Sequence, residues 1–250
     1  GNVASLVRRA LGEEGGSALV FLPGVGEIRR AEEALRDAGP NVDIAPLYGD
    51  LSPAEQDRAI APSPAGRRKV VLATSIAETS LTIEGVRIVV DGGQMRVPRF
   101  SPRSGMTRLE TVRVSQASAD QRRGRAGRLE RGVCYRLWTE EAQRGLLPFT
   151  PPEILDADLA PLALELAAWG TDGTTLPWLT SPPAAALATA RALLHDLVRH
   201  DIATLSPLKV TLSRHKREHP IAFLEPVEIE RLLATPDVST QAGLRDRAIL

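Results

Sequence analysis

The sequence has few of the features that mark secreted, membrane-bound or metal-binding proteins. Its 250 residues contain one cysteine, Cys134, so no disulfide can form within the chain, and a cytoplasmic location is expected. No apolar run reaches the roughly 20 residues of a membrane span, and no signal-peptide pattern precedes the first charged residues. The four histidines show no spacing typical of metal ligands, so no metal site is expected. Aromatic residues make up only 4% of the chain, which predicts a mostly aliphatic core.

Two phosphate-handling motifs are absent as well. The chain has no Gly-x-x-x-x-Gly-Lys-Ser/Thr loop, which cradles nucleotide phosphates, and no Asp-Glu-x-His segment. A Gly-x-Ser-x-Gly nucleophile motif is also missing. The chain opens on Gly1 and closes on the apolar pair Ile249-Leu250, so we expect it to be part of a longer protein.

Equal numbers of acidic and basic residues conceal an uneven distribution of charge. Residues 87–136 carry 12 Lys or Arg against 4 Asp or Glu, whereas residues 151–250 carry 9 against 13. A basic stretch of this density is typical of a face that binds a polyanion. Since almost all of the positive charge is arginine, a compositional habit of the genome is the alternative explanation.

The order of apolar segments predicts an α/β fold with a parallel sheet flanked by helices. Short buried strands are expected at 17–22, 42–46, 69–73, 87–90 and 132–138, with helices at 26–38 and from Ser52 to Ile60. Strands that alternate with helices indicate βαβ units. A hairpin is expected over 95–100 and 106–114, and a helix that begins after Ser118 is expected to carry the arginines that follow.

The pattern changes at Pro151-Pro152. Long Ala/Leu-rich helices are predicted at 153–169 and 184–198, and a polar, irregular stretch with short helical patterns follows them. We therefore predict three parts, at 1–150, 151–198 and 199–250, of which the last is a helical tail.

The most informative segment is the octamer Gln-Arg-Arg-Gly-Arg-Ala-Gly-Arg at 121–128. On a helix, Gln121, Arg125 and Arg128 would share one face because they are spaced i, i+4 and i+7. One carboxamide and two guanidiniums that point the same way suit a nucleotide γ-phosphate, since arginine forks two N–H bonds onto phosphate oxygens and keeps its charge. The two glycines predict close backbone approach or an early helix end. A solvated basic helix is the alternative.

This octamer resembles motif VI of superfamily 2 helicases, and the wider run from Ser115 to Trp138 resembles the DEAH-box branch. The resemblance implies that Gln121 helps to hold the γ-phosphate and the attacking water. It also implies that Arg125 and Arg128 are arginine fingers, supplied by a second RecA-like domain to ATP bound on a first.

Two further segments resemble motifs of the same family. The loop Ala-Thr-Ser-Ile-Ala-Glu-Thr-Ser-Leu-Thr-Ile-Glu-Gly at 73–85 is similar to motif V, and Phe-Leu-Pro-Gly at 21–24 is similar to motif IV. Carried over, Thr74 and Ser75 contact RNA phosphates, although the family usually has asparagine at 75. The nucleotide would lie near three residues of the same loop: Ser80, Thr82 and Glu84. Gly24 would let the RNA backbone approach closely. Arg96, with Arg99 and Arg103, either lines the RNA path or is solvated.

The order of these motifs, with Pro-Glu-Ile-Leu-x-Ala-Asp-Leu at 152–159 and Trp169-Gly170, is similar to bacterial DEAH-box helicases of the HrpB type over residues 1–195. In that family the helices after Pro152 begin a winged-helix domain, which this chain would hold in truncated form. The run from 197 to 250 resembles instead the linker and first helices of a tyrosine recombinase, without its catalytic residues. A join near residue 200, or a loosely packed helical appendage, would account for this tail.

The resemblance implies the second RecA-like domain of an ATP-dependent RNA helicase. Its cofactors would be ATP and Mg²⁺, with Mg²⁺ held by the missing first RecA-like domain. Its partners would be RNA or other single-stranded nucleic acid and that first domain, without a membrane. Because the phosphate loop is absent, the chain alone is predicted not to hydrolyse ATP. A non-catalytic nucleic-acid- or nucleotide-binding module, a DNA strand-exchange protein, and a relic of a helicase–recombinase fusion remain open.

Overall fold

The computed structural model describes residues 2–78, 83–128 and 131–199, with side chains described as far as Leu193. The chain divides into two compact units, Gly1–Ala203 and Thr204–Leu250. The second unit lies outside the described residues, and so does most of the predicted tail. The predicted boundaries at 150 and 198 remain predictions.

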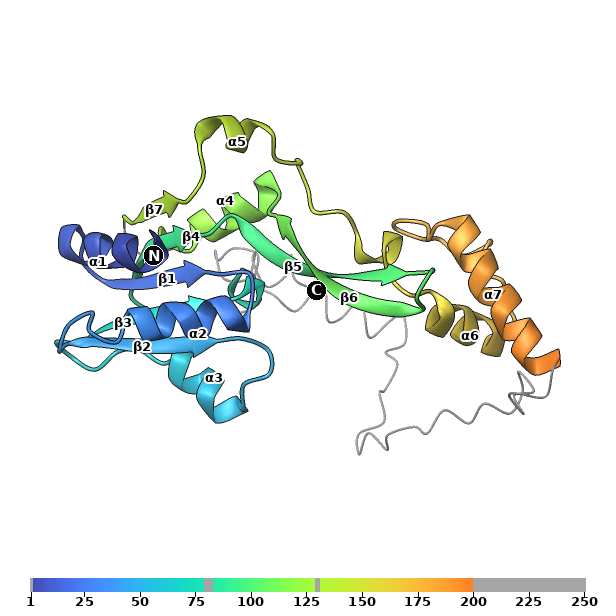
Figure 1. Ribbon diagram of the computed structural model, residues 1–250, viewed down its shortest axis with the longest axis horizontal. Coiled ribbons are helices and arrows are strands. Elements are labelled where there is room, and N and C mark those ends of the chain that lie inside the picture. The colour runs from blue at the N-terminus through green and yellow to red at the C-terminus, as the bar shows by residue number, and fades with distance from the viewer. Residues whose placement is uncertain (1, 79–82, 129–130, 200–250) are drawn as a thin grey trace, which may run out of the picture. The chain divides into compact units, whose positions relative to one another are not determined.

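The first unit is built around a five-stranded parallel sheet with β1 at its centre (Figure 1). Its strand order is β2-β3-β1-β4-β7. The strands are β1 Ser17–Phe21, β2 Val42–Leu47, β3 Arg68–Ala73, β4 Val86–Asp91 and β7 Val133–Arg136. The three inner strands β3, β1 and β4 are largely buried on both faces, as their unbroken apolar runs predict. All five predicted sheet strands are confirmed, with ends shifted by two residues at most.

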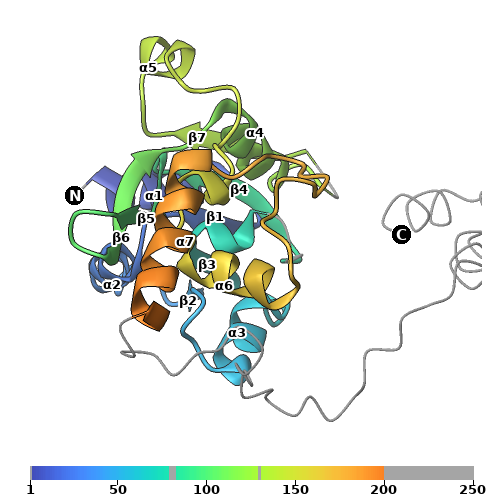
Figure 2. The same cartoon turned by 90° about the vertical axis from the view of Figure 1, so that its right-hand side faces the viewer.

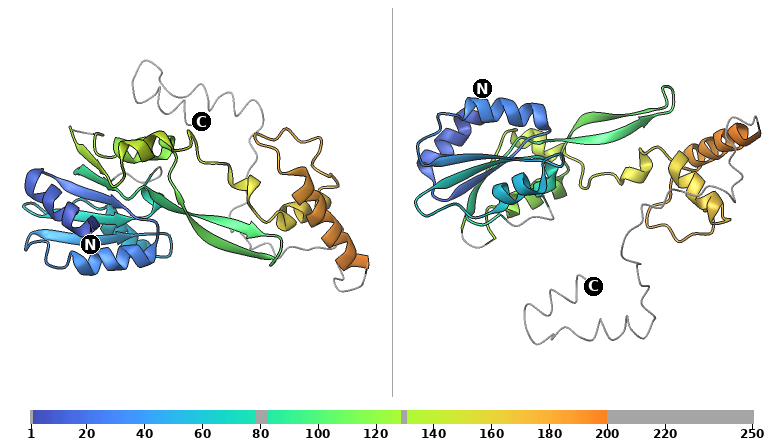
Figure 3. Two further views of the ribbon diagram at one scale, coloured as in Figure 1. Left: turned by 45° about the horizontal axis from the view of Figure 1, so that its top comes forward. Right: turned by 90° about the horizontal axis from the view of Figure 1, so that it is seen from below.

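Helices cover both faces of the sheet because alternate residues of each strand point to opposite sides (Figure 3). On one face, Ala18 and Val20 pack with α1 (Asn2–Glu13) and α2 (Val25–Ala34). On the other face, Leu19 and Phe21 pack with α3 (Pro53–Ile60) and with the segment that follows α4 (Gln116–Gly124). The expected parallel α/β fold is therefore confirmed.

An antiparallel hairpin leaves the sheet after β4. It consists of β5 (Gln94–Ser101) and β6 (Met106–Arg113), paired from Gln94–Arg113 to Ser101–Met106, as predicted. Gly93 forms the turn between β4 and β5 with φ +72°, and its amide donates to Asp91 Oδ1 at 2.9 Å. Positive φ favours glycine, which explains why this residue occupies the turn. A Cβ here would also lie 2.6 Å from Trp138 Cε3.

The region after the sheet is helical, but one predicted helix was wrong. Residues 153–169 do not form one long helix: a 3-10 turn, η2 (Glu153–Leu155), is separated from α6 (Ala160–Ala168). Pro161 has no amide proton and so favours the first turn of a helix, while Asp158 Oδ1 accepts the amide of Ala160 at 3.0 Å. Helix α7 (Ala184–Arg199) packs on α6 through Leu187, close to its predicted position (Figure 2).

Other differences from the sequence predictions concern helices. Helices α1 and α5 (Glu140–Arg144) were not predicted, and α2 ends at Ala34 rather than at 38. The predicted start of α3 at Ser52 is confirmed, and Ser52 forms a capping box in which Glu55 accepts the Ser52 amide at 2.9 Å. In the described part of the chain, no helix combines the length and apolar character that a membrane span requires.

Replacing Gly93 tests the turn that joins the sheet to the hairpin. Gly93→Ala adds backbone strain and a clash with Trp138, so we expect the free energy of unfolding to fall by about 3 kcal/mol. Gly66→Ala is the matched control, since Gly66 also has positive φ but no atom lies within 4 Å of its added Cβ. That control should cost about 1 kcal/mol. Urea unfolding of the 250-residue chain measures both, and equal losses would show that the contact with Trp138 is unimportant.

Candidate functional site

The arginine-rich octamer lies on the last turn of α4 and the segment after it. Helix α4 begins one turn earlier than predicted: Ser115 is its N-cap, and Ser115 Oγ accepts the amide of Ser118 at 3.1 Å. The expected cap at Ser118 was therefore wrong. The helix ends at Gly124, and residues 125–127 form a turn. The early end predicted from the two glycines is confirmed, so helical spacing relates Gln121 to Arg125 but does not extend to Arg128.

Arg122 is the most deeply buried charged residue of this segment, with 1% of its surface exposed. Its Nε and Nη2 donate to Glu78 Oε1 at 2.7 and 2.5 Å, and its Nη1 donates to Asp91 Oδ1 at 2.8 Å. The guanidinium also lies 4.8 Å from the ring centre of Phe21. Asp91 is fully buried, and its Oδ2 has no hydrogen-bond partner among the described residues. Arg122 thus ties α4 to β4 and to the loop after β3.

Arg125 and Arg128 come together over one face of the sheet. They line a small depression of about 10 Å³ with Leu19, Ile83 and Val86. Arg125 is 8% exposed, and its Nε donates to the Glu78 main-chain carbonyl at 2.8 Å. Burial lowers the pKa of Arg125, and the nearby charge of Arg128 lowers it further. Two like charges in a partly buried site repel, and an anion near both would reduce that repulsion.

Gln121 lies one helical turn before Arg125 and is exposed. It does not line the depression formed by Arg125 and Arg128. The structure therefore brings the two arginines together, while the predicted convergence of Gln121 on the same point remains a prediction.

The described ends of the 74–85 loop lie at opposite edges of the sheet. Thr74 follows the carboxyl end of β3, while the Gly85 carbonyl accepts the amide of Ser17 at the amino end of β1. Glu78, within this loop, accepts hydrogen bonds from Arg122 at its side chain and from Arg125 at its main-chain carbonyl. Of the nucleotide contacts predicted here, Ser80 and Thr82 lie outside the described residues. Glu84 is exposed beside Ile83.

The predicted nucleic-acid contacts gather at the carboxyl edge of the sheet. Gly24 follows β1, and Thr74 and Ser75 follow the neighbouring strand β3, where the Leu22 amide donates to the Ala73 carbonyl at 2.8 Å. The Arg96 side chain reaches back from the hairpin to Gly24, since a Cβ at Gly24 would lie 2.6 Å from Arg96 Cζ. Ligands of open α/β sheets bind at this edge. Gly24, Thr74 and Ser75 thus lie at the carboxyl edge of the sheet, and Arg96 reaches the same edge from the hairpin.

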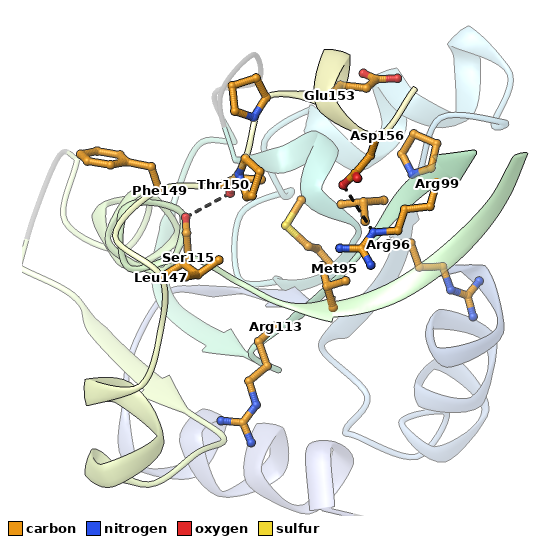
Figure 4. A pocket seen from close by; sticks show the side chains of 15 residues that line it. Met95, Arg96, Arg99, Arg113, Ser115, Leu147, Phe149, Thr150, Glu153 and Asp156 are labelled. Atoms are coloured by element: carbon orange, nitrogen blue, oxygen red, sulfur yellow. Dashed lines mark hydrogen bonds and ion pairs between the residues drawn. The ribbon is translucent and has the colours of Figure 1, made fainter. Parts of the chain in front are cut away.

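A cavity of about 440 Å³ lies between the base of the hairpin and the chain that follows β7 (Figure 4). The chain from 147 to 156 forms one wall and the hairpin the other. Arg99 pairs with Glu110 at 3.1 Å and with Asp156 at 3.4 Å, and the Phe100 amide donates to the Asp156 carbonyl at 2.9 Å. Ser115 and Thr150 join the walls through a 3.1 Å hydrogen bond. Arg99 therefore holds the hairpin to this segment.

Five parallel strands in this order, with helices on both faces and an arginine-rich turn beside the loop after β3, define a RecA-like domain. A family model, the helicase conserved C-terminal domain, matches residues 2–130. The chain belongs to the helicase C-terminal domain family.

Individual relatives carry the same assignment further. The chain is 53% identical over 197 residues to the ATP-dependent RNA helicase HrpB of Escherichia coli, which covers 78% of this chain and 24% of that protein. It is 41% identical over 188 residues to the probable ATP-dependent RNA helicase DHX34 of Homo sapiens, covering 74% of this chain and 16% of that protein. Crystal structures of the E. coli DExH-box NTPase HrpB and of the E. coli DEAH/RHA helicase HrpB superpose with TM-scores of 0.73 and 0.74. Each match is 52% identical in sequence and covers 78% of this chain. It covers 24% of the first structure's chain and 25% of the second structure's chain.

The chain thus spans a quarter or less of the length of these relatives. The DEAH-box resemblance of the HrpB type is confirmed by these comparisons. The resemblance of the tail to tyrosine recombinases receives no support from them.

Sequence reasoning missed the buried network because it could not tell which arginine faces inward. One signal was present. Ala119, Arg122 and Ala126 are spaced i, i+3 and i+7, and all three are buried, with 0%, 1% and 3% of their surface exposed. Ala119 lies one turn before Arg122 on α4, and Ala126 lies in the turn after the helix. Small apolar residues at these spacings on both sides of an arginine indicate that the arginine enters the core. Asp91, at the end of an apolar strand, was its natural partner.

Arg122 can be tested against its exposed neighbour. Arg122→Met leaves the buried Asp91 without its arginine and removes two hydrogen bonds to Glu78, so we expect the free energy of unfolding to fall by about 3–5 kcal/mol. Arg123→Met is the control, because Arg123 is exposed and lies 3.6 Å from Asp120; it should change stability by less than about 0.5 kcal/mol. Urea unfolding measures the two changes. Equal effects would refute a structural role for the buried network.

Proposed function

We propose that this chain is the second RecA-like domain of an ATP-dependent RNA helicase and that Arg125 and Arg128 clamp the terminal phosphate of ATP. The observation that carries the proposal is the convergence of these two guanidiniums beside Ile83 and Val86. Arginine forks onto phosphate oxygens in two-bond geometry and stays charged at every physiological pH. Burial, and then repulsion from Arg128, lowers the pKa of Arg125, and an anion close to both arginines would offset the repulsion.

The remaining nucleotide contacts follow from the same placement. Gln121, one turn before Arg125, would reach the attacking water once ATP is bound. Ser80, Thr82 and Glu84 belong to the same 74–85 loop as Ile83, which lines the depression, and Glu84 follows Ile83 directly in sequence. We propose these three as contacts to the nucleotide and Gln121 as the residue that orients water.

ATP fits this domain only at its outer phosphate. The depression of about 10 Å³ is far too small to enclose a nucleotide. The described residues include no group of three or more His, Cys, Asp or Glu side chains that could hold a metal ion. Phosphoryl transfer needs a metal, a phosphate-binding lysine and an arginine finger together. We therefore propose that a preceding RecA-like domain holds ATP and Mg²⁺, which supply the reacting phosphoryl group and neutralise its charge.

RNA is proposed to cross the carboxyl edge of the sheet. Gly24, Thr74 and Ser75 lie at the ends of the adjoining strands β1 and β3, and Arg96 reaches them from the hairpin. A small residue, two hydroxyls and a guanidinium suit a phosphate backbone and read no base. Binding should therefore be indifferent to sequence and weaken as salt rises. We place the activity in the cytoplasm, as the single cysteine favours.

One loop joins the two proposed sites. Thr74 begins the 74–85 loop at the RNA edge, and Glu78 within it accepts Arg125. A shift of the loop on RNA binding would move the arginine that meets ATP. Closure of the cleft between the two domains would then couple hydrolysis to movement along the strand.

Supplying the first domain tests this function. The 250-residue chain alone should not hydrolyse ATP. Joined behind the first RecA-like domain of E. coli HrpB, it should hydrolyse ATP faster when RNA is added. Arg125→Ala or Arg128→Ala in that fusion should lower kcat about a thousandfold, as expected for an arginine finger.

Arg123→Ala is the control for this experiment, because Arg123 belongs to the same segment but is exposed. It should leave kcat within about twofold. ATP hydrolysis by the chain alone, or full activity without Arg125, would refute the proposed roles. RNA binding by a fusion that never hydrolyses ATP would indicate a non-catalytic binding module instead.

A further inference from the structure

Gly24 is covered in a way that its proposed role does not explain. It is buried, although it is proposed to receive the RNA backbone. The atom group that covers it is the guanidinium of Arg96: a Cβ at Gly24 would lie 2.6 Å from Cζ and 2.9 Å from Nε. A phosphate can therefore reach the Gly24 backbone only if this guanidinium moves.

Glu27, on the first turn of α2, holds Arg96 in that position. Its Oε2 accepts Arg96 Nη2 at 3.3 Å, while its Oε1 accepts Arg30 Nη2 at 2.6 Å. The side chains of Glu27 and Arg96 are 27% and 36% exposed, so water and solutes reach the longer pair. If Arg96 leaves, Glu27 keeps the shorter bond to Arg30. Glu27 therefore still has a cationic partner when Arg96 is released.

The neighbouring arginine of β5 is held differently. Arg99 contacts two carboxylates, Glu110 at 3.1 Å and Asp156 at 3.4 Å, beside the main-chain bond that fixes the hairpin to the following segment. Among the described residues, Arg96 has one such partner, Glu27, at 3.3 Å. Of these two arginines, Arg96 is the one that a phosphate can capture at lower cost.

We propose that Glu27 competes with the RNA backbone for Arg96 and so sets how tightly this domain binds RNA. Without RNA, the Glu27 carboxylate holds the guanidinium over Gly24. When RNA binds, a backbone phosphate takes Arg96 from Glu27, and the exposed Gly24 backbone lets the strand settle at the sheet edge. The inference rests on the proposed RNA site and names the residue that tunes it.

The competition has a physical consequence for selectivity. An exposed ion pair is weak, so a phosphate with comparable or better geometry displaces it. A lone anion gains one contact and must break the pair, whereas a phosphate in a continuous strand arrives already positioned by contacts at Thr74 and Ser75. The pair therefore lowers affinity for isolated anions more than for a bound strand.

A double-mutant cycle on the fusion that contains the full chain tests this inference. The readout is the Kd for a fluorescent oligouridylate at low salt. Glu27→Gln keeps the shape of the side chain but weakens its hold on Arg96, so it should tighten RNA binding about two- to fivefold. Arg96→Ala should weaken binding. In the Arg96→Ala background, Glu27→Gln should then change Kd by less than about 1.5-fold.

Glu33→Gln is the matched control, because Glu33 lies on the same helix, carries the same charge and pairs with Arg36. It should leave Kd nearly unchanged. A gain from Glu27→Gln that persists without Arg96, or that Glu33→Gln reproduces, would mean a general field effect and overturn the competition. No RNA binding by the unsubstituted fusion would overturn the proposed function together with this inference, whereas binding with a flat cycle overturns this inference alone.

Discussion

The arrangement of both proposed sites depends on one buried ion network, in which Arg122 binds Glu78 and Asp91. Arg122 belongs to α4, Glu78 to the loop after β3, and Asp91 to the end of β4, so one guanidinium fixes three segments that are far apart in sequence. Removing a charge from water is costly, and bidentate pairing with carboxylates offsets that cost only in one geometry. The network therefore favours a single placement of α4 over the sheet. Arg125 and Arg128 owe their position to it, since they follow Arg122 within two turns of chain.

The same network helps to explain how the two proposed sites could be linked within one small domain. The carboxyl edge of the sheet is reached from the ends of β1 and β3, while the arginines lie over the face beside β1 and the start of β4. These places are joined by a loop that begins at Thr74 and passes Glu78 to Gly85. A packed core does not deform smoothly, so a shift at one end of a short, anchored loop is felt at the other. The proposed coupling between the two sites would run through this loop.

Much of the fold could be predicted because each inner strand is a continuous apolar run, which β3 and β4 show most clearly. The predictions failed where tertiary contacts or a single side chain decide. Pro161 and Asp158 start α6 late, within a stretch whose Ala/Leu content suggests an unbroken helix. Motif resemblance singled out Arg125 and Arg128, which line one depression with Ile83 of the loop after β3; their predicted roles remain proposals. Local spacing alone would have placed Arg128 on the helix, which ends at Gly124. The inward turn of Arg122 was readable only from the flanking alanines.

Charge pairing separates arginines that serve structure from those left to meet a ligand, and this distinction is invisible in a count of basic residues. Arg122 is enclosed by two carboxylates, and Arg99 is held by two more in the half of the hairpin next to its turn. Arg96 has a longer, exposed pair with Glu27. A guanidinium with weak or neutral partners gains most from a phosphate, because little must be broken to form the new bonds. By that criterion the basic stretch at 87–136 divides into a structural part and a part proposed to bind the RNA backbone. Arg96 belongs to the proposed binding part.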